Sequence, residues 1–332
     1  MKKPGQAAVE SVPDPVPSEN SLLLKVRRVG FCGSDLNSFR GKNPLVTFPR
    51  IPGHEVSATI VEGSLTNPAL SAGVDVTLSP YTNCGACAAC RRGRPNACKF
   101  NETLGVQRDG ALAEYIRVPP EKIYTAKLSL TELCLVEPLT VGFHAVARGR
   151  VTANDSVAVF GCGGVGFGAI AASSYRGAKT IAVDVADEKL ETARAVGAAH
   201  TVNTLRDDLH KQLVELTDGH GPDVVIEAIG LPQTFRAAVE EVAFTGRVVS
   251  IGYAKEPVSY ETRFFVQKEL DILGSRNALP ENFREVIQML EEHRFPVKEA
   301  ITSIVSMDEA PAALRSWSDD PSRIKKILVS LD

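Results

Sequence analysis

Hydrophobic residues follow different patterns in the first and second parts of the chain. Up to about residue 145, short β-branched runs such as SLLLKVRRVG, EVSATIVEG and DVTLSP are separated by Gly and Pro. Runs bounded in this way indicate a β-rich domain. From about residue 155, apolar runs alternate with helical segments, which is typical of a parallel sheet built from βαβ units.

The second part is predicted to contain six strands, SVAVF, TIAVDV, AHTVN, DVVIEAI, RVVSIG and LDILGS. Helices are predicted between them at about 164–176, 187–197, 207–217 and 232–244. This alternation predicts a doubly wound α/β architecture. After Gly274, the spacing of NFREVIQMLEEH predicts another helix, and the final KKILVSLD resembles the strands of the first part.

The tail is therefore expected to return to the first domain. We expect residues 1–146 and 276–332 to form a β-rich domain and residues 147–275 to form the doubly wound domain. A chain of 332 residues is also longer than most single hydrophobic cores, so size alone favours two domains.

Composition and charge favour a cytoplasmic globular protein that acts on small molecules. Hydrophobic residues make up 44% and charged residues 23% of the chain, and the net charge is -3 with both signs interspersed. This distribution argues against nucleic acid and anionic lipid as partners. The first residues lack a secretory pattern, and we find no stretch of roughly 18 apolar residues such as a membrane span requires.

A glycine-rich turn follows the predicted strand SVAVF and precedes an Ala-rich helix, so a G-x-G-x-x-G pattern stands where dinucleotide binding requires it. Gly161 permits the tight turn, Gly163 lets a pyrophosphate approach the backbone, and Gly166 lets the helix pack closely on the strand. Backbone N–H groups and the helix dipole then favour phosphate. The predicted cofactor residues of the turn are Gly161, Gly163, Gly164, Val165 and Gly166.

The next predicted strand ends at Asp184, where a carboxylate can accept hydrogen bonds from an adenosine ribose and repel a 2′-phosphate. The residues directly after Asp184 include no Arg. Both features favour NAD over NADP as the cofactor. The alternative for the whole segment is a glycine-rich turn and a polar strand end that bind nothing.

Four of the seven cysteines form a C-x2-C-x2-C-x7-C cluster, in which glycines allow tight turns around one ion. Four sulfur ligands leave no open position, so the predicted role is a structural zinc site that stabilises a loop-like lobe. An iron–sulfur cluster is the alternative, because C-x2-C-x2-C also begins ferredoxin-type runs. The predicted ligands are Cys84, Cys87, Cys90 and Cys98.

A second group of metal-binding side chains is spread over the first part of the chain. Cys32 in GFCGSD, His54 and Glu55 in PGHE, and Glu137 in VEPL offer one thiolate, one imidazole and two carboxylates. Each alone is unremarkable, since a single His is more often a core or surface residue than a ligand. Together they make a candidate metal site.

The segments GFCGSD, GHE, the four-cysteine cluster, VEPLTVGFHA and GCGGVG occur in the order typical of zinc-dependent medium-chain dehydrogenases. The chain resembles that family over nearly its whole length. VEPL resembles the sorbitol and threonine dehydrogenase branch, in which a glutamate, here Glu137, replaces a cysteine of the liver-type alcohol dehydrogenases. The resemblance implies a GroES-like catalytic domain, a Rossmann cofactor domain, and a dimer or tetramer formed through the edge of the cofactor-domain sheet.

Carried over by motif, the resemblance makes Cys32 and His54 ligands of a catalytic zinc. Glu55 and Glu137 become direct or water-mediated ligands, in an order that the sequence leaves open. The matching supporting residues are Asp35 as hydrogen-bond partner of the ligating His, Ser34 beside the reacting oxygen, and Lys189 near the adenosine ribose.

The implied reaction is transfer of hydride from a secondary alcohol to NAD, which yields the ketone. Zinc would serve as a Lewis acid that favours ionisation of the alcohol. The proton would leave through Ser34 or through water held by Glu55 and Glu137.

The substrate is the least determined feature. The stretch FRGKNPLVTFPRIPGHE resembles bacterial sugar-acid dehydrogenases of the galactonate type, which favours a polyol, sugar or aldonate. Threonine is the second candidate, and simple alcohols come after it. The cations and amide that are candidates for contacts with hydroxyl or carboxylate groups are Arg40, Lys42, Arg276 and Asn277, for which surface solvation is the alternative.

Two other classes of protein remain as alternatives. A non-catalytic, NAD-binding structural protein would share the fold, because fold alone does not establish activity. A zinc-free quinone reductase would be expected to lack both cysteine-containing groups.

Overall fold

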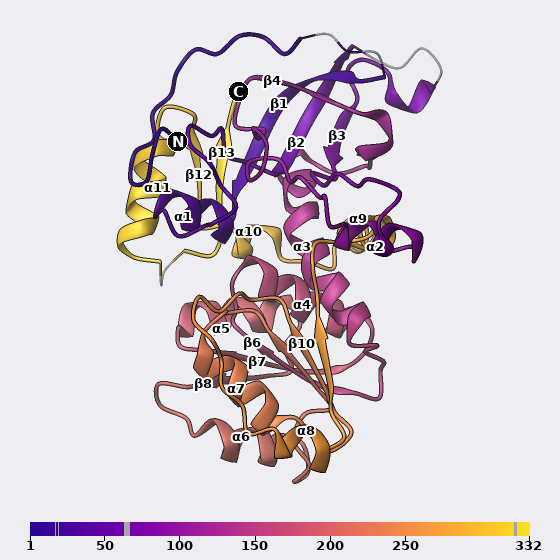
Figure 1. Ribbon diagram of the computed structural model, residues 1–332, viewed down its shortest axis with the longest axis vertical. Helices are drawn as coiled ribbons and strands as arrows, with labels where there is room; N and C mark the ends of the chain where they lie inside the picture. Colours follow the sequence, from indigo (N-terminus) through magenta and orange to yellow (C-terminus); the bar gives the residue numbers. More distant parts are fainter. Residues whose placement is uncertain (17, 19, 63–66, 322–323) are drawn as a thin grey trace. The chain divides into compact units, whose positions relative to one another are not determined.

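The computed structural model describes residues 1–16, 18, 20–62, 67–321 and 324–332. Contacts divide the chain into two compact units (Figure 1). Unit 1 comprises Met1–Pro138, Leu279–Glu292 and Ile301–Asp332, and unit 2 comprises Leu139–Ala278 and His293–Ala300. The sequence places its boundaries after residues 146 and 275, whereas the contacts change after Pro138 and Ala278.

Unit 1 is built on a sheet whose centre is the long strand β1 (Leu22–Phe31). Residues Leu22, Leu24 and Val26 are buried on alternate positions, as expected for a strand with one face on the core. The strand order is β12-β13-β1-β2-β3-β5, with β4 also paired to β1. The other strands are β2 (Glu55–Glu62), β3 (Asp75–Leu78), β4 (Tyr115–Val118), β5 (Ile123–Thr125), β12 (Ser303–Ser306) and β13 (Ile327–Ser330).

Both ends of the chain contribute to unit 1 (Figure 1), as the resemblance of the tail to the first strands predicts. β13 pairs antiparallel with the second half of β1, so that Ile327 lies opposite Phe31. This pairing puts the start of β13 beside the end of β1. The helical segments of unit 1 are α1 (Gly33–Phe39), η1 (Pro68–Leu70), α2 (Ala88–Arg91), η2 (Pro95–Ala97), η3 (Pro120–Lys122), α9 (Pro280–Glu291) and α11 (Ala310–Asp319).

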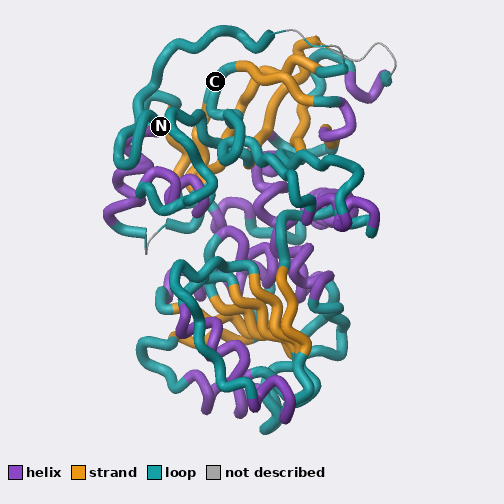
Figure 2. Tube along the Cα trace, in the orientation of Figure 1, coloured by secondary structure: helices purple, strands orange, loops and turns teal. Residues whose placement is uncertain are grey.

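Unit 2 contains a parallel sheet, whose strands are drawn in orange in the lower part of Figure 2. The strand order is β11-β10-β9-β6-β7-β8. Numbered within the unit, this is the 3-2-1-4-5-6 order of a Rossmann fold, so the predicted fold class is confirmed. Each of the six predicted apolar runs forms a strand. They are β6 (Ser156–Phe160), β7 (Lys179–Asp184), β8 (His200–Asn203), β9 (Val224–Glu227), β10 (Arg247–Ser250) and β11 (Asp271–Gly274).

The four helices predicted between these strands are also present, and each ends one to three residues earlier than predicted. They are α4 (Gly164–Tyr175), α5 (Asp187–Val196), α6 (Leu209–Leu216) and α7 (Pro232–Glu241). Two short helices complete the unit, α8 (Arg263–Gln267) and α10 (Val297–Ala300), and α10 contacts α5.

The helix α3 (Leu130–Arg148) corrects one expectation. By length and composition it is apolar enough to cross a membrane, although the sequence analysis finds no such stretch. However, 72% of its apolar window is buried inside the protein, as in the core helix of a globular protein. Ser129 and Glu132 form a capping box at its start, in which the Ser129 N–H donates to Glu132 Oε2 at 2.8 Å.

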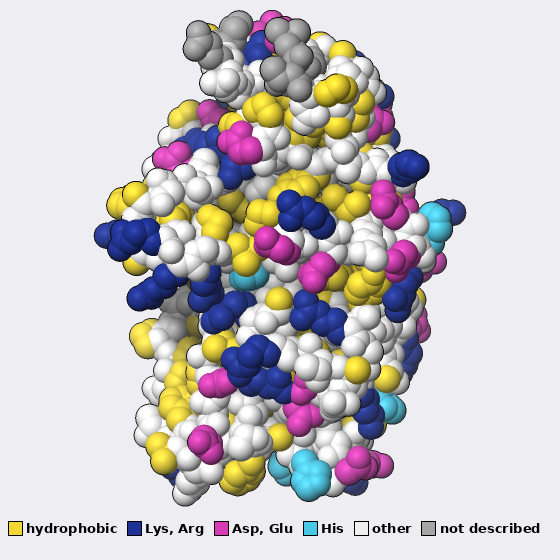
Figure 3. All heavy atoms as spheres, turned by 90° about the vertical axis from the view of Figure 1, so that its right-hand side faces the viewer, with side chains coloured by type: hydrophobic (Ala, Val, Ile, Leu, Met, Phe, Trp, Pro, Cys, Tyr) yellow, Lys and Arg dark blue, Asp and Glu magenta, His cyan; other side chains and the backbone are white. Residues whose placement is uncertain are grey.

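Charged side chains of both signs lie interspersed on the face drawn in Figure 3. This agrees with the small net charge of -3.

Candidate active site

The first candidate ligand, Cys32, follows the last residue of β1 and caps α1. Its backbone N–H donates to Asp35 Oδ2 at 2.9 Å, so the carboxylate at the third position of the helix fixes the turn. The central strand of the sheet thereby holds the Cys32 side chain at a defined place. Asp35 itself is 1% exposed.

His54 lies beside Asp35 and Ser34. Asp35 Oδ2 is 4.0 Å from His54 Nδ1, which is a charge contact longer than a hydrogen bond, and Ser34 Oγ is 3.5 Å from His54 Nε2. Burial alone would lower the pKa of His54, but the negative charges of Asp35 and Cys32 raise it well above its usual value. In the described chain, His54 Nδ1 and Asp35 Oδ1 are buried without a hydrogen-bond partner.

Glu55 is the first residue of β2 and lies opposite Gly30 of β1. A side chain at Gly30 would place its Cβ 2.1 Å from Glu55 Oε2, so only glycine leaves room for this carboxylate. Lys326 Nζ donates to both Glu55 oxygens at 2.6 Å and to the Phe31 carbonyl at 3.2 Å. Glu55 is therefore a buried carboxylate held by a buried ammonium group.

Glu137 projects from α3 and is also buried. Its Oε1 accepts a hydrogen bond from the Tyr81 hydroxyl. Burial raises the pKa of the Glu137 carboxyl to about 7, although the neighbouring His54 acts in the opposite direction. The Glu137 side chain thus bonds the Tyr81 hydroxyl, whereas the Glu55 side chain bonds the Lys326 ammonium group.

The structure brings Cys32, His54 and Glu55 together with ligand atoms that all lie within 4.8 Å of one another. One thiolate, one imidazole and one carboxylate are ligands that zinc accepts, at bond lengths of about 2.0–2.3 Å that place neighbouring ligand atoms roughly 3–4 Å apart. The three residues thus fit a metal ion. Glu137 is not part of the group that meets this spacing.

The four predicted cysteines of the lobe form a second group that meets the same spacing. The Sγ atoms of Cys87 and Cys90 are 3.5 Å apart, and those of Cys87 and Cys98 are 3.8 Å apart. Tetrahedral zinc–thiolate geometry requires roughly 3.8 Å between sulfurs. Backbone N–H groups of Cys90 and Lys99 lower the pKa of the Cys87 thiol to about 6, which favours the thiolate that a metal needs.

In unit 2, the glycine-rich turn has the geometry that its sequence predicts. Gly161 has φ +99°, in the region that favours glycine. A Cβ at Gly166 would lie 1.8 Å from the Gly161 carbonyl oxygen, so the helix packs too closely for any side chain. A Cβ at Gly163 would meet nothing within 4 Å, so the backbone faces open space there, as a phosphate cradle requires. Gly164 and Val165 form the first turn of α4.

Asp184 ends β7 next to the turn. Its Oδ2 accepts the Cys162 N–H at 2.7 Å, and its Oδ1 accepts the N–H groups of Val185 and Ala186 at 2.8 and 3.0 Å. The carboxylate therefore shapes the glycine turn as well as facing it. Lys189 lies in the first turn of α5, and its charge acts against the burial that raises the pKa of the Cys162 thiol in the glycine turn.

The candidate substrate residues do not share one environment. Arg40 Nε donates to Ser318 Oγ at 3.1 Å, and its guanidinium also bonds the Ser318 carbonyl, so α11 holds this side chain. Lys42 is exposed. Arg276 and Asn277 belong to unit 2 and are half-buried after β11.

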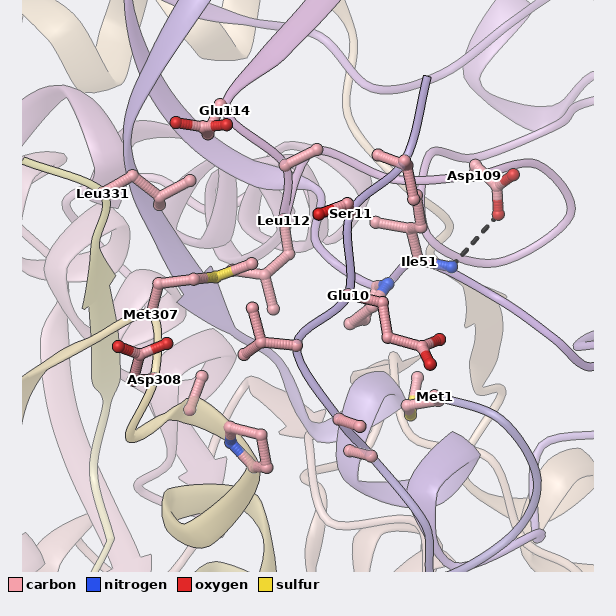
Figure 4. A pocket seen from close by; sticks show the side chains of 18 of the residues that line it. Met1, Glu10, Ser11, Ile51, Asp109, Leu112, Glu114, Met307, Asp308 and Leu331 are labelled. Carbon is pink, nitrogen blue, oxygen red and sulfur yellow. Dashed lines mark hydrogen bonds between the residues drawn. The ribbon is translucent and has the colours of Figure 1, made fainter. Parts of the chain in front are cut away.

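A cavity of about 900 Å³ in unit 1 lies elsewhere, beneath the segment Ala7–Pro15 (Figure 4). Leu112, Met307 and Leu331 line it together with Glu10 and Asp308. Cys32, His54 and Glu55 do not line this cavity, so it is separate from the candidate metal site.

Sequence reasoning missed the residues Gly30, Tyr81 and Lys326. Lys326 is separated from Glu55 by 271 positions and Tyr81 from Glu137 by 56. No local spacing links these pairs. The sequence gives one signal for Lys326, because this lysine directly precedes the apolar final strand and is therefore a candidate for burial.

The chain contains a Rossmann unit with the complete glycine-rich phosphate turn. Its other unit contains a thiolate–imidazole–carboxylate group and a lobe with four thiolates. Together these features define the class of two-domain, metal-dependent dehydrogenases. Comparison with known families agrees. Residues 18–128 match the alcohol dehydrogenase GroES-like domain, and residues 164–292 match the zinc-binding dehydrogenase domain. The chain belongs to the zinc-dependent medium-chain alcohol dehydrogenases, which act on CH–OH groups.

Two relatives illustrate the range of similarity. An uncharacterized zinc-type alcohol dehydrogenase-like protein of Haemophilus influenzae is 34% identical over 98% of this chain and 96% of its own length. L-galactonate-5-dehydrogenase of Escherichia coli is 31% identical over 85% of this chain and 86% of its own length.

Solved structures show the same fold over the whole chain. An alcohol dehydrogenase of Escherichia coli, RspB, in complex with NADH has a TM-score of 0.91 at 28% identity and covers 99% of this chain and 97% of its own. A zinc-binding dehydrogenase from Sinorhizobium meliloti bound to NADP has a TM-score of 0.90 at 29% identity and covers 98% and 96%.

Proposed function

We propose that this protein is an NAD-linked dehydrogenase that oxidises a secondary hydroxyl of a polyol, sugar or sugar acid to a ketone. The observation that carries the proposal is the convergence of Cys32, His54 and Glu55 within 4.8 Å at the end of the central strand. Three protein ligands leave a fourth position for substrate, as in catalytic zinc sites. The intact ligand set argues against a non-catalytic protein and a zinc-free reductase.

Cys32, His54 and Glu55 would hold the catalytic zinc ion, which supplies a Lewis acid when bound. Asp35 faces His54 Nδ1 and so favours the ring orientation in which Nε2 serves as ligand. Ser34 Oγ, 3.5 Å from that nitrogen, is the hydroxyl that takes the proton of the substrate. Glu137, with its raised pKa, holds water or substrate next to this group.

The cofactor assignment rests on the turn Gly161–Gly166, with its open backbone at Gly163, and on Asp184. A nicotinamide cofactor accepts the hydride. The Asp184 carboxylate would repel a 2′-phosphate, which supports NAD. By resemblance to the family, Lys189, five residues after Asp184, would approach the adenosine ribose. The Sinorhizobium meliloti relative is bound to NADP, so NADP is the alternative cofactor, and the two cofactors have to be compared by measurement.

A second zinc ion is proposed for the four-cysteine lobe, with Cys84, Cys87, Cys90 and Cys98 as ligands. The sulfur separations of 3.5 and 3.8 Å support a mononuclear tetrathiolate site. No position remains for substrate, so its role is structural.

The substrate class rests on the relatives. The similarity to L-galactonate-5-dehydrogenase favours a sugar acid, and that to sorbitol dehydrogenases favours a polyol. L-threonine 3-dehydrogenase of Bacillus licheniformis, 31% identical over 93% of this chain, supports threonine as the second candidate. Because Arg40 is bound to Ser318 of α11, we propose the exposed Lys42 as the first of the candidate substrate residues to test.

We further propose a homodimer, or a homotetramer that contains the same pair, formed by pairing of the edge strand β11, because Ile272 on that strand is 48% exposed. The proposal also includes the domain boundaries. The catalytic domain would comprise residues 1–146 and 276–332, and the cofactor domain residues 147–275. Cytoplasmic location stays a prediction from the sequence.

The test is a screen of polyols, aldonates and hydroxy amino acids with NAD and with NADP, in which reduced-nicotinamide absorbance is followed. The variants Cys32→Ser and His54→Ala should lose at least about 1000-fold in kcat/KM, because the Lewis acid is lost, and should retain the wild-type circular dichroism spectrum. Full activity in either variant, or fewer than two zinc ions per wild-type chain, would contradict the proposal.

A further inference from the structure

Lys326 is a buried cation whose position follows from strand pairing. It directly precedes β13, and Ile327 of β13 pairs with Phe31 of β1, the residue before Cys32. The backbone thereby sets the Lys326 side chain beside the end of β1. Only 6% of the residue is exposed, and its partner Glu55 is 1% exposed.

The ammonium group of Lys326 is fully used. It has three N–H donors, and it donates to Glu55 Oε1, Glu55 Oε2 and the Phe31 carbonyl at 2.6, 2.6 and 3.2 Å. Both carboxylate oxygens of Glu55 are therefore shared symmetrically with one cation. Each still has a lone pair that it can offer to another group.

Stability alone does not account for this ion pair. Removing two charges from water costs about as much as their attraction returns, so a buried pair is weak support for folding. Gly30 also leaves the space that the Glu55 carboxylate occupies, since a Cβ there would lie 2.1 Å from Oε2. The two strands of unit 1 thus keep a specific place for a charged pair next to Cys32 and His54.

With the proposed metal bound, Glu55 would interact with two cations, because its ligand atom is within 4.8 Å of those of Cys32 and His54 and both its oxygens accept from Lys326. Lys326 withdraws electron density from both Glu55 oxygens. We infer that Lys326 is a positioning residue that competes with the metal for Glu55 and keeps this carboxylate a weak, exchangeable ligand. A position for the substrate then remains accessible. This inference rests on the proposed metal site.

The experiment measures metal loss rather than turnover. Purified holoprotein is mixed with excess chelator, and zinc release is followed with a colorimetric indicator. The phase that belongs to the Cys32 site is the one missing in Cys32→Ser. In Lys326→Met, Glu55 is left without its counter-charge and turns to the metal, so this phase should slow. We expect about 10-fold, which is the size of effect that partners of metal ligands have, but in the direction of tighter binding because a competing cation is removed.

The cobalt-substituted protein gives an independent readout. A stronger Glu55–metal bond should change the intensity and position of the visible absorption of Co²⁺ in Lys326→Met. Lys326→Arg, which keeps the charge, should resemble the wild type. The neighbouring Lys325→Met is the matched control for loss of a lysine at this end of β13, and its release rate should equal that of the wild type.

The effect also has to depend on Glu55. In a Glu55→Gln background, Lys326→Met should leave the release rate unchanged within about 2-fold, because no carboxylate remains to be freed. If Lys326→Met does not fold, Lys326→Gln, which can donate a hydrogen bond without charge, should shift the rate in the same direction.

Unchanged or faster metal loss in the folded Lys326 variants, or the same slowing in the Glu55→Gln background, would overturn the inference. Absence of any Cys32-dependent metal phase in the wild type would instead refute the proposed metal site. The two failures are therefore distinguishable.

Discussion

Gly30 shows how one residue without a side chain shapes the candidate active site. It pairs with Glu55 across β1 and β2, and the carboxylate of Glu55 fills the space where a Cβ would stand. The chemistry of the site thus depends on an absent side chain as well as on the ligands. Gly30 is the first residue of GFCGSD, but its role becomes visible only in its close approach to Glu55.

Gly30→Ala should therefore displace Glu55 and strain its ion pair with Lys326. We expect a loss of about 1–3 kcal/mol in the free energy of unfolding, as for overpacked cores, and reduced zinc at the Cys32 site. Urea denaturation and metal analysis measure both effects.

Gly33→Ala is the matched control, since a Cβ at Gly33 meets nothing within 4 Å. Equal stability and equal metal content of the two variants would show that the space at Gly30 is not required.

At the scale of elements, the four-cysteine lobe differs from the rest of unit 1. Its helix α2 has four residues, none of them buried, and η2 has three. Such short elements bury little apolar surface, so hydrophobic packing stabilises the lobe weakly. The metal ligands have to provide the remaining stabilisation.

Cys84→Ala should release about one metal ion per chain, because a structural site loses one of four ligands. The lobe should then become accessible to protease between residues 84 and 101. Limited proteolysis followed by mass spectrometry detects this cleavage.

The wild type treated with chelator is the reference and should show the same new cleavage sites. A variant that keeps two metal ions and resists protease would mean that the lobe folds without its fourth thiolate.

At the scale of the whole molecule, both sheets end in an exposed edge. β11 closes the sheet of unit 2 with Ile272 48% exposed, and β12 closes the sheet of unit 1 with Ile304 50% exposed. The proposed dimer uses the first edge, where β11 of one copy would pair with β11 of a second copy and join the sheets of the two cofactor domains.

Ile272→Arg should therefore convert the proposed dimer into monomers, because a charge at a strand edge opposes pairing with a second copy. Light scattering gives the mass directly. The same substitution at Ile304 serves as control and should leave the mass unchanged. A dimer that persists in Ile272→Arg, or dissociates in Ile304→Arg, would place the interface elsewhere.

The sequence by itself determined the Rossmann unit almost completely. Its strands are apolar runs bounded by turn residues, so the residues next to each strand determine where it begins and ends. The six predicted strands match β6 to β11 within about two residues. The turn Gly161–Gly166 and the cysteine lobe were equally readable, because a turn or a metal clamp formed by neighbouring residues depends on spacing along the chain.

Only the tertiary structure decided how the metal site is completed. Glu55 meets Lys326 across 271 positions, Glu137 meets Tyr81, and Arg40 is taken up by Ser318 of α11 across 278 positions. These contacts depend on the register of β1 with β2 and β13 and on how the tail folds back. Local spacing carries no information on such registers, because they follow from the packing of strands that are distant in sequence.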